Sequence, residues 1–335
     1  MAVAPDKAPA SSDPGGPAPS RTPGGLAVGL LRRFLTLREG SIVVVALVAL
    51  IYFSVTVNNF LTGANFKSLL PYFTYLVIMG AGEVFVMTLG EIDLSIGALF
   101  LITPFIYWKF TEAGIPLVPS IILALVVAAL IGAVNGFLTA WVGIASFVVT
   151  LAMLFFLDGI TLIISHSEQI TTPGTSVVST STVADVFGAG TYSELFWAIG
   201  IVILLQLVLS FTRWGLHTVA VGGNRLGAAE AGVNTRLVLL RNFVLSAMTA
   251  GLSGILEAVR TSSMSPDPSG SSFDMLLAIA AVIIGGTVMT GGSGTVVGAL
   301  IGAFFLGVLT DGLIVKGVSA NYEDMYLGLA IIIAM

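Results

Sequence analysis

Long apolar runs dominate this chain and restrict the folds that it can adopt. The first extends from Ile42 to Val57, and others follow at intervals along the remaining sequence. A helix needs roughly 20 apolar residues to cross the hydrocarbon layer of a bilayer, because each residue adds about 1.5 Å to its length. Most of the runs come close to that length. The sequence therefore predicts an all-α, polytopic membrane protein.

The composition agrees with this prediction. Asp, Glu, Lys and Arg make up 9% of the 335 residues, whereas soluble domains average about 25%. The formal net charge is −5, which excludes a basic surface for nucleic acid. The chain has no cysteine, and its two histidines are far apart in sequence. We therefore expect no metal site, no cofactor and no nucleic-acid partner.

About ten candidate transmembrane spans follow one another along the chain. The last is too short to cross a bilayer and ends in an apolar sequence, so we expect a truncated helix there. The spans lie near 42–57, 69–90, 96–110, 118–141, 144–164, 194–211, 237–260, 273–290, 295–316 and 325–335.

The basic residues indicate the direction of the spans, because Lys and Arg accumulate on the cytoplasmic side. They are frequent before the first span and after the sixth, and the loop at 165–193 has none. This pattern predicts a cytoplasmic N-terminus and a cytoplasmic loop near 212–236. Residues 1–28, rich in Pro, Ala and Gly, are predicted to be a disordered cytoplasmic tail, and residues 29–335 to be the transmembrane domain.

Five polar residues interrupt apolar sequence in the second to fourth spans: Glu83, Glu91, Asp93, Ser95 and Asn135. A charged side chain at the centre of a membrane costs roughly 2.5 to 3.5 kcal/mol, so such groups face protein, water or the interface. One interpretation is a polar substrate pathway, in which Asp93 and Ser95 cap a helix whose exposed N-terminus offers N–H donors to a solute. The other is a plain helix cap at the cytoplasmic interface.

Other polar and small residues have predicted roles in helix packing. Gln206 is expected to bond across helices, and Glu257 to pair with Arg260, three residues further along its helix. Gly132 and Gly136 in the fourth span have the spacing that brings two membrane helices into close contact. Asp274 is a further ionisable residue within a span.

A short helix is predicted within the basic loop. Asn224 is a favoured N-cap, and Gly232 suits the left-handed position after a helix. The two-turn helix between them could seat in a groove of a partner protein, or it could lie on the lipid headgroups. The residues expected to contact the partner are Asn224, Arg225, Ala228, Ala229, Glu230 and Gly232.

Three motifs together resemble the ribose-type permeases of bacterial ABC sugar importers, in the branched-chain amino acid/ribose permease superfamily. They are Glu91 to Gly97, Gly222 to Gly232, and the run from Ala278 to Thr287 with the glycines that follow it. The likeness runs in order from about residue 40 to residue 335.

The resemblance implies a multi-pass transport subunit of the bacterial plasma membrane, without catalytic residues. It implies that cytoplasmic ABC ATPase subunits dock on the loop from Asn224 to Gly232, that an extracytoplasmic binding protein delivers a monosaccharide or related polyol, and that a second permease copy forms a homo- or heterodimer. The chain lacks a G-x-x-x-x-G-K-[ST] loop, so a partner must supply the energy of ATP. The alternative is a secondary transporter driven by an ion gradient through Glu83, Asp93 and Asp311.

This chain departs from the family pattern at four positions: Glu91, Ala145, Asp158 and Asp311 replace the usual Gly, Pro, Arg and Asn. Three of these changes add a carboxylate, which favours a cationic or heavily hydroxylated solute. Alternatively, Asp158 and Asp311 lie near the outer interface or pair with Arg260 and Lys316.

Overall fold

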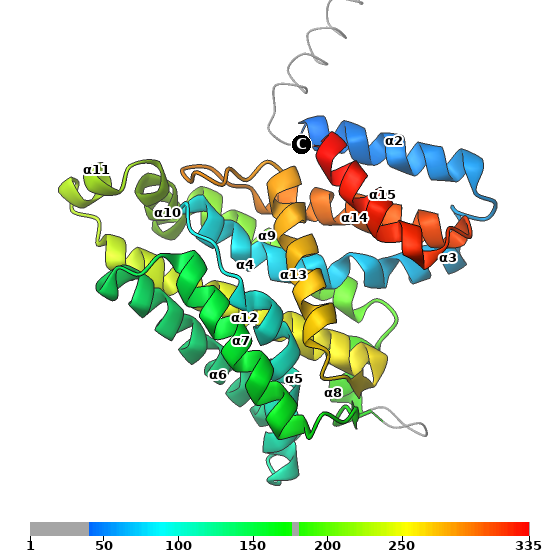
Figure 1. Cartoon of the computed structure of the whole chain (residues 1–335), viewed down its shortest axis with the longest axis horizontal. Helices are drawn as coiled ribbons and strands as arrows, with labels where there is room; N and C mark the ends of the chain where they lie inside the picture. Colours follow the sequence, from blue (N-terminus) through cyan, green and yellow to red (C-terminus); the bar gives the residue numbers. More distant parts are fainter. Residues whose placement is uncertain (1–39, 176–180, 335) are drawn as a thin grey trace, which may run out of the picture. The chain divides into compact units, whose positions relative to one another are not determined.

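The structure is a computed structural model that describes residues 40–175 and 181–334. The tail expected at 1–28 lies outside these residues. The described residues form helices with short connections, and their one sheet is a two-residue antiparallel ladder of β1 (Ile170–Thr171) and β2 (Ser263–Met264) (Figure 1). The prediction of an all-α polytopic membrane protein is confirmed.

The helices follow the order of the predicted spans. The first part of the chain contains α2 (Gly40–Thr56), α3 (Gly63–Leu69), η1 (Leu70–Tyr72), α4 (Thr74–Thr88), α5 (Ser95–Glu112), α6 (Leu117–Phe137), η2 (Leu138–Val142) and α7 (Ser146–Ser165). The second part contains α8 (Thr182–Ala184), η3 (Asp185–Ala189), α9 (Ser193–Phe211), α10 (Arg213–Gly223), α11 (Arg225–Glu230), α12 (Thr235–Thr261), α13 (Pro268–Ile284), α14 (Val296–Val315) and α15 (Ala320–Ala334).

Each predicted span contains most or all of one long α-helix, with η1 and η2 adjoining α4 and α6. Fewer of these helices are long and apolar enough to cross a membrane. Within the described residues six helical segments meet both conditions. Helices α2 and α13 are apolar but have 17 residues each, and α5 and α15 are not among the six. The six are 63–88, 117–142, 146–165, 193–211, 235–261 and 296–315.

Helices α4 and α12 form the centre of the described fold. Every residue of α4 except Tyr75 is buried, and α12 packs against α4, α5 and α6. Glycine makes these contacts close, as predicted for Gly132: a Cβ atom there would lie 2.5 Å from the carbonyl oxygen of Phe243 in α12. Because the helix backbones touch, the helices are expected to move as rigid bodies rather than to deform.

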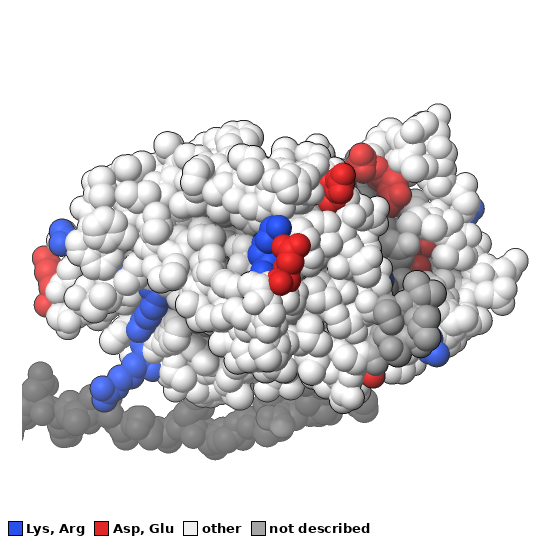
Figure 2. Space-filling model, turned by 90° about the horizontal axis from the view of Figure 1, so that it is seen from below, with Lys and Arg blue, Asp and Glu red and all other residues white. Residues whose placement is uncertain are grey.

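Large apolar side chains cover much of the outer surface. Phe155 and Phe156 of α7 are 67% and 62% exposed, and Phe196 of α9 is 71% exposed. On the face seen in Figure 2, charged side chains form separate small groups on a surface that is otherwise uncharged. Such a surface suits contact with hydrocarbon rather than with water.

Candidate functional site

Helix α11 stands at the left edge of the view in Figure 1, next to α10. Asn224 caps it, with its Oδ1 atom accepting a hydrogen bond from the N–H of Gly227 at 2.9 Å. Gly232 follows the helix with a φ of +84°, a left-handed conformation that favours glycine. The predicted helix and both of its ends are therefore confirmed.

One side of α11 is exposed and the other is anchored. Arg225, Leu226, Ala229 and Glu230 are exposed, and Leu226 is 71% accessible although it is apolar. Ala228 is the buried residue of the helix. A solvated helix gains nothing by presenting leucine to water, so this exposed side is suited to contact with a partner protein.

Ala228 attaches α11 to the membrane domain. It belongs to a small apolar cluster with Leu89, Val221, Val238 and Leu239. These side chains come from α10, from the start of α12 and from the end of α4. The sequence reasoning did not predict α10, an amphipathic helix that separates α9 from α11.

Glu91 lies beside α11 and not with the other predicted pathway residues. Its Oε1 atom is 2.5 Å from Nη2 of Arg225. The side chain of Glu91 is 15% exposed and that of Arg225 is 49% exposed. The structure thus places Glu91 in an ion pair that joins the α4–α5 connection to the short helix.

Three chain segments meet through glycine at the ends of α4 and α10, in what we call the glycine junction (Gly90, Gly222, Gly291 and Gly292). The N–H of Gly292 donates to the carbonyl of Thr88 at 2.8 Å. A Cβ atom on Gly222 would lie 1.8 Å from the same carbonyl oxygen. The ends of α4 and α10 and the α13–α14 connection, which reaches toward α10 in Figure 1, are therefore in backbone contact.

Four predicted pathway residues come together in the interior, in what we call the carboxyl cluster (Glu83, Asp93, Ser95 and Asn135, with Ser246). Oε1 of Glu83 accepts from the N–H of Asp93 at 3.0 Å, and the Ser246 hydroxyl donates to Oε2 of Glu83 at 3.2 Å. Oδ1 of Asp93 accepts from the N–H and the hydroxyl of Ser95 at 2.9 and 2.6 Å. The Asn135 amide donates to the Ser95 hydroxyl at 2.9 Å.

The carboxyl cluster joins α4, α5, α6 and α12 and is closed to solvent. Each of its residues is 0% exposed. The expectation of an exposed N-terminus on α5 is wrong, because a Cβ atom on Gly97 in its first turn would lie 2.9 Å from the carbonyl oxygen of Ser271. Ser95 is the first residue of α5. Asp93 precedes the helix, and its Oδ1 atom accepts the hydrogen bond from the N–H of Ser95.

A cavity of about 480 Å³ lies between α4, α5, α12 and α13. We call it the Tyr75 pocket. Its walls are formed near the C-terminal end of α12, whereas α11 directly precedes the start of α12. The aromatic lining residues are Tyr72, Tyr75, Phe100 and Phe105, and the charged ones are Glu257, Arg260, Asp267 and Asp274.

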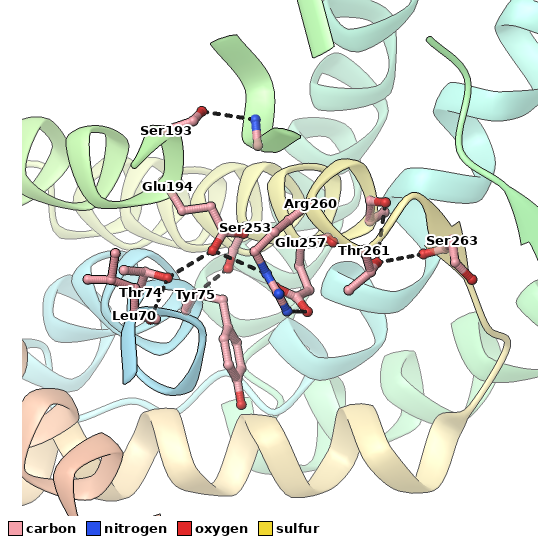
Figure 3. Close-up of polar contacts among 12 residues, drawn as sticks. Leu70, Thr74, Tyr75, Ser193, Glu194, Ser253, Glu257, Arg260, Thr261 and Ser263 are labelled. Carbon is pink, nitrogen blue, oxygen red and sulfur yellow. Dashed lines mark hydrogen bonds and ion pairs between the residues drawn. The ribbon is translucent and has the colours of Figure 1, made fainter. Parts of the chain in front are cut away.

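Ion pairs and hydrogen bonds hold the polar wall of the Tyr75 pocket in place (Figure 3). Arg260 pairs with Glu257 on the same helix, as predicted, and also lies 3.5 Å from Oε2 of Glu194 in α9. The Thr74 hydroxyl donates to Oε2 of Glu194 at 2.9 Å. Tyr75 points toward α13, where its hydroxyl donates to Oδ1 of Asp274 at 2.7 Å.

Gln206 and Asp311, two further polar residues within predicted spans, each form hydrogen bonds to another helix. Gln206 bonds across helices as predicted, since its Oε1 accepts from the N–H groups of Val296 and Val297 at 2.8 and 3.1 Å. Asp311 accepts from Asn65 at 2.7 Å, so its pairing with Lys316 or Arg260 is wrong.

Asp158 is 8% exposed, and its Oδ1 atom has no hydrogen-bond partner among the described residues. Its pairing with Arg260 or Lys316 is also wrong. The described part of the chain contains no group of three His, Cys, Asp or Glu residues that could hold a metal ion.

Sequence reasoning missed the aromatic lining of the Tyr75 pocket and Glu194. Tyr75 and Phe100 stand within apolar runs, where an aromatic residue facing a cavity has the same sequence signature as one in the core. Glu194 opens a predicted span, where a carboxylate is usual at a helix start. No local signal distinguishes these residues.

Comparison with known proteins supplies the context for this geometry. The family model described as "Branched-chain amino acid transport system / permease component" matches residues 65–335. The ribose import permease protein RbsC of Escherichia coli K12 is 32% identical over 91% of this chain and 95% of its own length.

Two further relatives are similar over most of their length. The xylose/arabinose import permease protein XylH of Sulfolobus acidocaldarius is 33% identical over 91% of this chain and 85% of its own. The fructose import permease protein FrcC of Rhizobium meliloti is 32% identical over 91% and 86%. No solved structure matches the chain.

Proposed function

We propose that this chain, which belongs to the family of branched-chain amino acid transport system permease components, is the membrane-spanning subunit of an ATP-driven importer. The imported solute is a monosaccharide or related polyol. A permease component is a transport subunit and not an enzyme. The solute class rests on the names of the relatives, which import ribose, xylose or arabinose, and fructose.

The main support for this proposal is that α11 is capped at its start, anchored on one side and exposed on the other. A six-residue helix is too short to be stable alone, yet this one has a cap at its start and a glycine after its end. Ala228 fixes it to the membrane domain, and Leu226, Ala229 and Glu230 are left exposed. We assign this exposed side to the cytoplasmic ATPase subunits, with Asn224, Arg225 and Gly232 setting its position.

The contacts of α11 suggest how movement of the ATPase reaches the interior. A displacement of the helix would act on the α4–α5 connection through the Glu91–Arg225 ion pair. Asp93 in that connection bonds to Glu83 of α4, so the carboxyl cluster would move with it. The glycine junction would carry the same displacement to α13 and α14, as a rigid-body shift of packed helices.

The proposed topology follows the basic residues. The N-terminus and the loop near 212–236 are cytoplasmic, residues 29–335 form the permease domain, and about ten helices cross the membrane, including the short α2 and α13. The Tyr75 pocket then lies toward the outer side, where a solute-binding protein would deliver its ligand. A second permease copy would complete the pathway.

An ion-gradient carrier is less well supported. Glu83 and Asp93 are hydrogen-bonded within a closed cluster, and Asp311 bonds to Asn65. A carrier that uses an ion gradient also has no need for an exposed, capped helix in the cytoplasm. Membership of a permease-component family favours a transport system of several subunits.

The proposal is tested by isolating the complex that this chain forms in its own cells. We expect tagged protein to co-purify with an ATPase subunit, and the Ala229→Trp variant to lose that subunit while remaining in the membrane. Isolation of the chain without any ATPase, under conditions that preserve known membrane complexes, would contradict the proposal.

A further inference from the structure

We infer that the Tyr75 pocket is a binding site for a polyhydroxylated ring without negative charge, with Asp274 as the acceptor for a ring hydroxyl and Tyr75 and Phe100 as the surface on which the ring lies. This inference rests on the proposed function. It adds the location of the solute site, the residues that form it and the charge class that it accepts.

The size and position of the pocket suit a small solute. Its volume of about 480 Å³ falls in the range of roughly 300 to 1,000 Å³ that ligand sites occupy. Tyr75, Phe100, Glu257 and Asp274 are each partly exposed, so a molecule in the cavity can reach them. The pocket is also lined by four separate helices, so movement between them would alter it.

The inner end of the pocket is closed by helix contacts. A Cβ atom on Gly254 of α12 would lie 1.9 Å from the carbonyl oxygen of Phe100, and one on Gly251 would lie 2.8 Å from Oγ1 of Thr103 in α5. The carboxyl cluster lies further along the same helices. A solute that enters the pocket would therefore be held there until the helices separate.

Tyr75 and Phe100 form an apolar wall on which one face of a sugar ring can pack. The rings of Tyr75 and Phe100 lie 5.7 Å apart at an angle of 38°. One face of a sugar ring carries mainly C–H groups, which pack on aromatic rings while the hydroxyls point elsewhere. Sugar hydroxyls would then face the polar wall that Glu257, Arg260 and Asp274 form.

Asp274 retains a free acceptor for such a hydroxyl. Tyr75 donates to its Oδ1 atom at 2.7 Å, and no other donor from the described residues reaches either oxygen. The second oxygen, Oδ2, can therefore accept from a solute hydroxyl. Glu257 differs, since both of its carboxylate oxygens accept from Arg260.

The charges around the pocket select against anionic solutes. The lining carries three carboxylates, Glu257, Asp267 and Asp274, and one cation, Arg260, so its formal charge is 1 − 3 = −2. Glu194 also lies 3.5 Å from Arg260 and compensates its charge. A sugar phosphate or a sugar acid would meet uncompensated carboxylates in a weakly screened site, whereas a neutral polyol would not.

The test is saturation-transfer NMR on the purified full-length chain in lipid nanodiscs. The probes are D-ribose, D-xylose, D-allose and D-fructose, with D-glucuronate and ribose 5-phosphate as anionic counterparts. We expect transfer to the C–H protons of at least one neutral sugar and none to the anions. Absence of transfer to all four neutral sugars, or equal transfer to an anion, would overturn the inference.

Two variants locate the binding. Asp274→Asn replaces a charged acceptor with a neutral one, and we expect about fivefold weaker binding. Phe100→Ala removes the ring surface, and we expect binding to weaken about threefold or more. The control is Asp311→Asn, the same change in a residue that bonds to Asn65 and does not line the pocket. This variant should bind sugar as the unaltered protein does.

The outcomes separate this inference from the proposed function. Wild-type binding in both Asp274→Asn and Phe100→Ala would overturn the pocket assignment, and ATP-driven sugar uptake by the assembled importer would still support the proposed function. Sugar binding by the isolated chain without any ATP-driven uptake would instead contradict the proposed function alone.

Discussion

Nη2 of Arg225 lies 2.5 Å from Oε1 of Glu91. This ion pair joins the exposed helix α11 to the α4–α5 connection, which carries Asp93 of the carboxyl cluster. The two residues are 134 positions apart in sequence. Partly exposed ion pairs contribute about 0 to 1 kcal/mol to stability. An ion pair can still fix the position of one segment relative to another. We assign this role to the Glu91–Arg225 pair.

The Glu91–Arg225 pair is predicted to link ATP hydrolysis to transport. Glu91→Arg should lower the sugar transported per ATP hydrolysed, because two like charges would push α11 away from the α4–α5 connection. Exchanging both charges, as Glu91→Arg with Arg225→Glu, should restore most of this ratio. The measurement is parallel uptake and ATPase activity in proteoliposomes. A double variant no better than the single one would contradict the assignment.

The exposed side of α11 is predicted to bind the ATPase. Ala229→Trp should abolish co-purification of the ATPase subunit, since a large ring would prevent the helix from seating in a groove. Ala152→Trp is the matched control, because Ala152 is exposed on α7 among lipid-facing side chains. Both variants should reach the membrane at normal levels. Retention of the ATPase by Ala229→Trp would argue against this docking surface.

The glycine junction is predicted to tolerate no side chain at Gly222. A Cβ atom there would lie 1.8 Å from the Thr88 carbonyl oxygen, whereas one on the adjacent Gly223 would lie 3.8 Å from its nearest neighbour. Gly222→Ala should therefore lower the free energy of unfolding by about 1 to 3 kcal/mol, and Gly223→Ala by much less. Thermal melting in detergent compares the two, and equal melting temperatures would disprove the close contact.

The carboxyl cluster is predicted to act as one hydrogen-bonded unit. Asn135→Leu removes the donor to Ser95 and should lower the free energy of unfolding by about 1 to 3 kcal/mol. Ser95→Ala removes the other half of the same bond. The double variant should therefore lose less stability than the sum of the single changes. Strict additivity would show that the two side chains do not interact.

The sequence predicted best those features that depend on neighbouring residues. Asn224 and Gly232 mark the ends of α11 because a helix cap and a left-handed glycine act within a few residues. The Glu257–Arg260 pair has the same local origin. The apolar runs also predicted the helices, although about ten spans is more than length and apolarity alone support.

Features that depend on distant segments could not be predicted in the same way. A polar side chain within a membrane span is energetically costly, which marks Glu83, Asp93, Ser95 and Asn135 one by one. Their common cluster, however, is a consequence of how four helices pack. Glu91 is close to Asp93 and Ser95 in sequence, which predicts a common site, yet its partner comes from α11. The Tyr75 pocket has no sequence signature at all.

We propose that this chain is a conduit whose movement is supplied by an ATPase through α11. The most direct test is sugar uptake by sealed proteoliposomes that contain the chain alone or the chain with its ATPase and binding protein. We predict uptake against a gradient only in the complete system with ATP, and none with Ala229→Trp. Concentrative uptake by the chain alone, driven by an ion gradient without nucleotide, would show that the chain needs no ATPase.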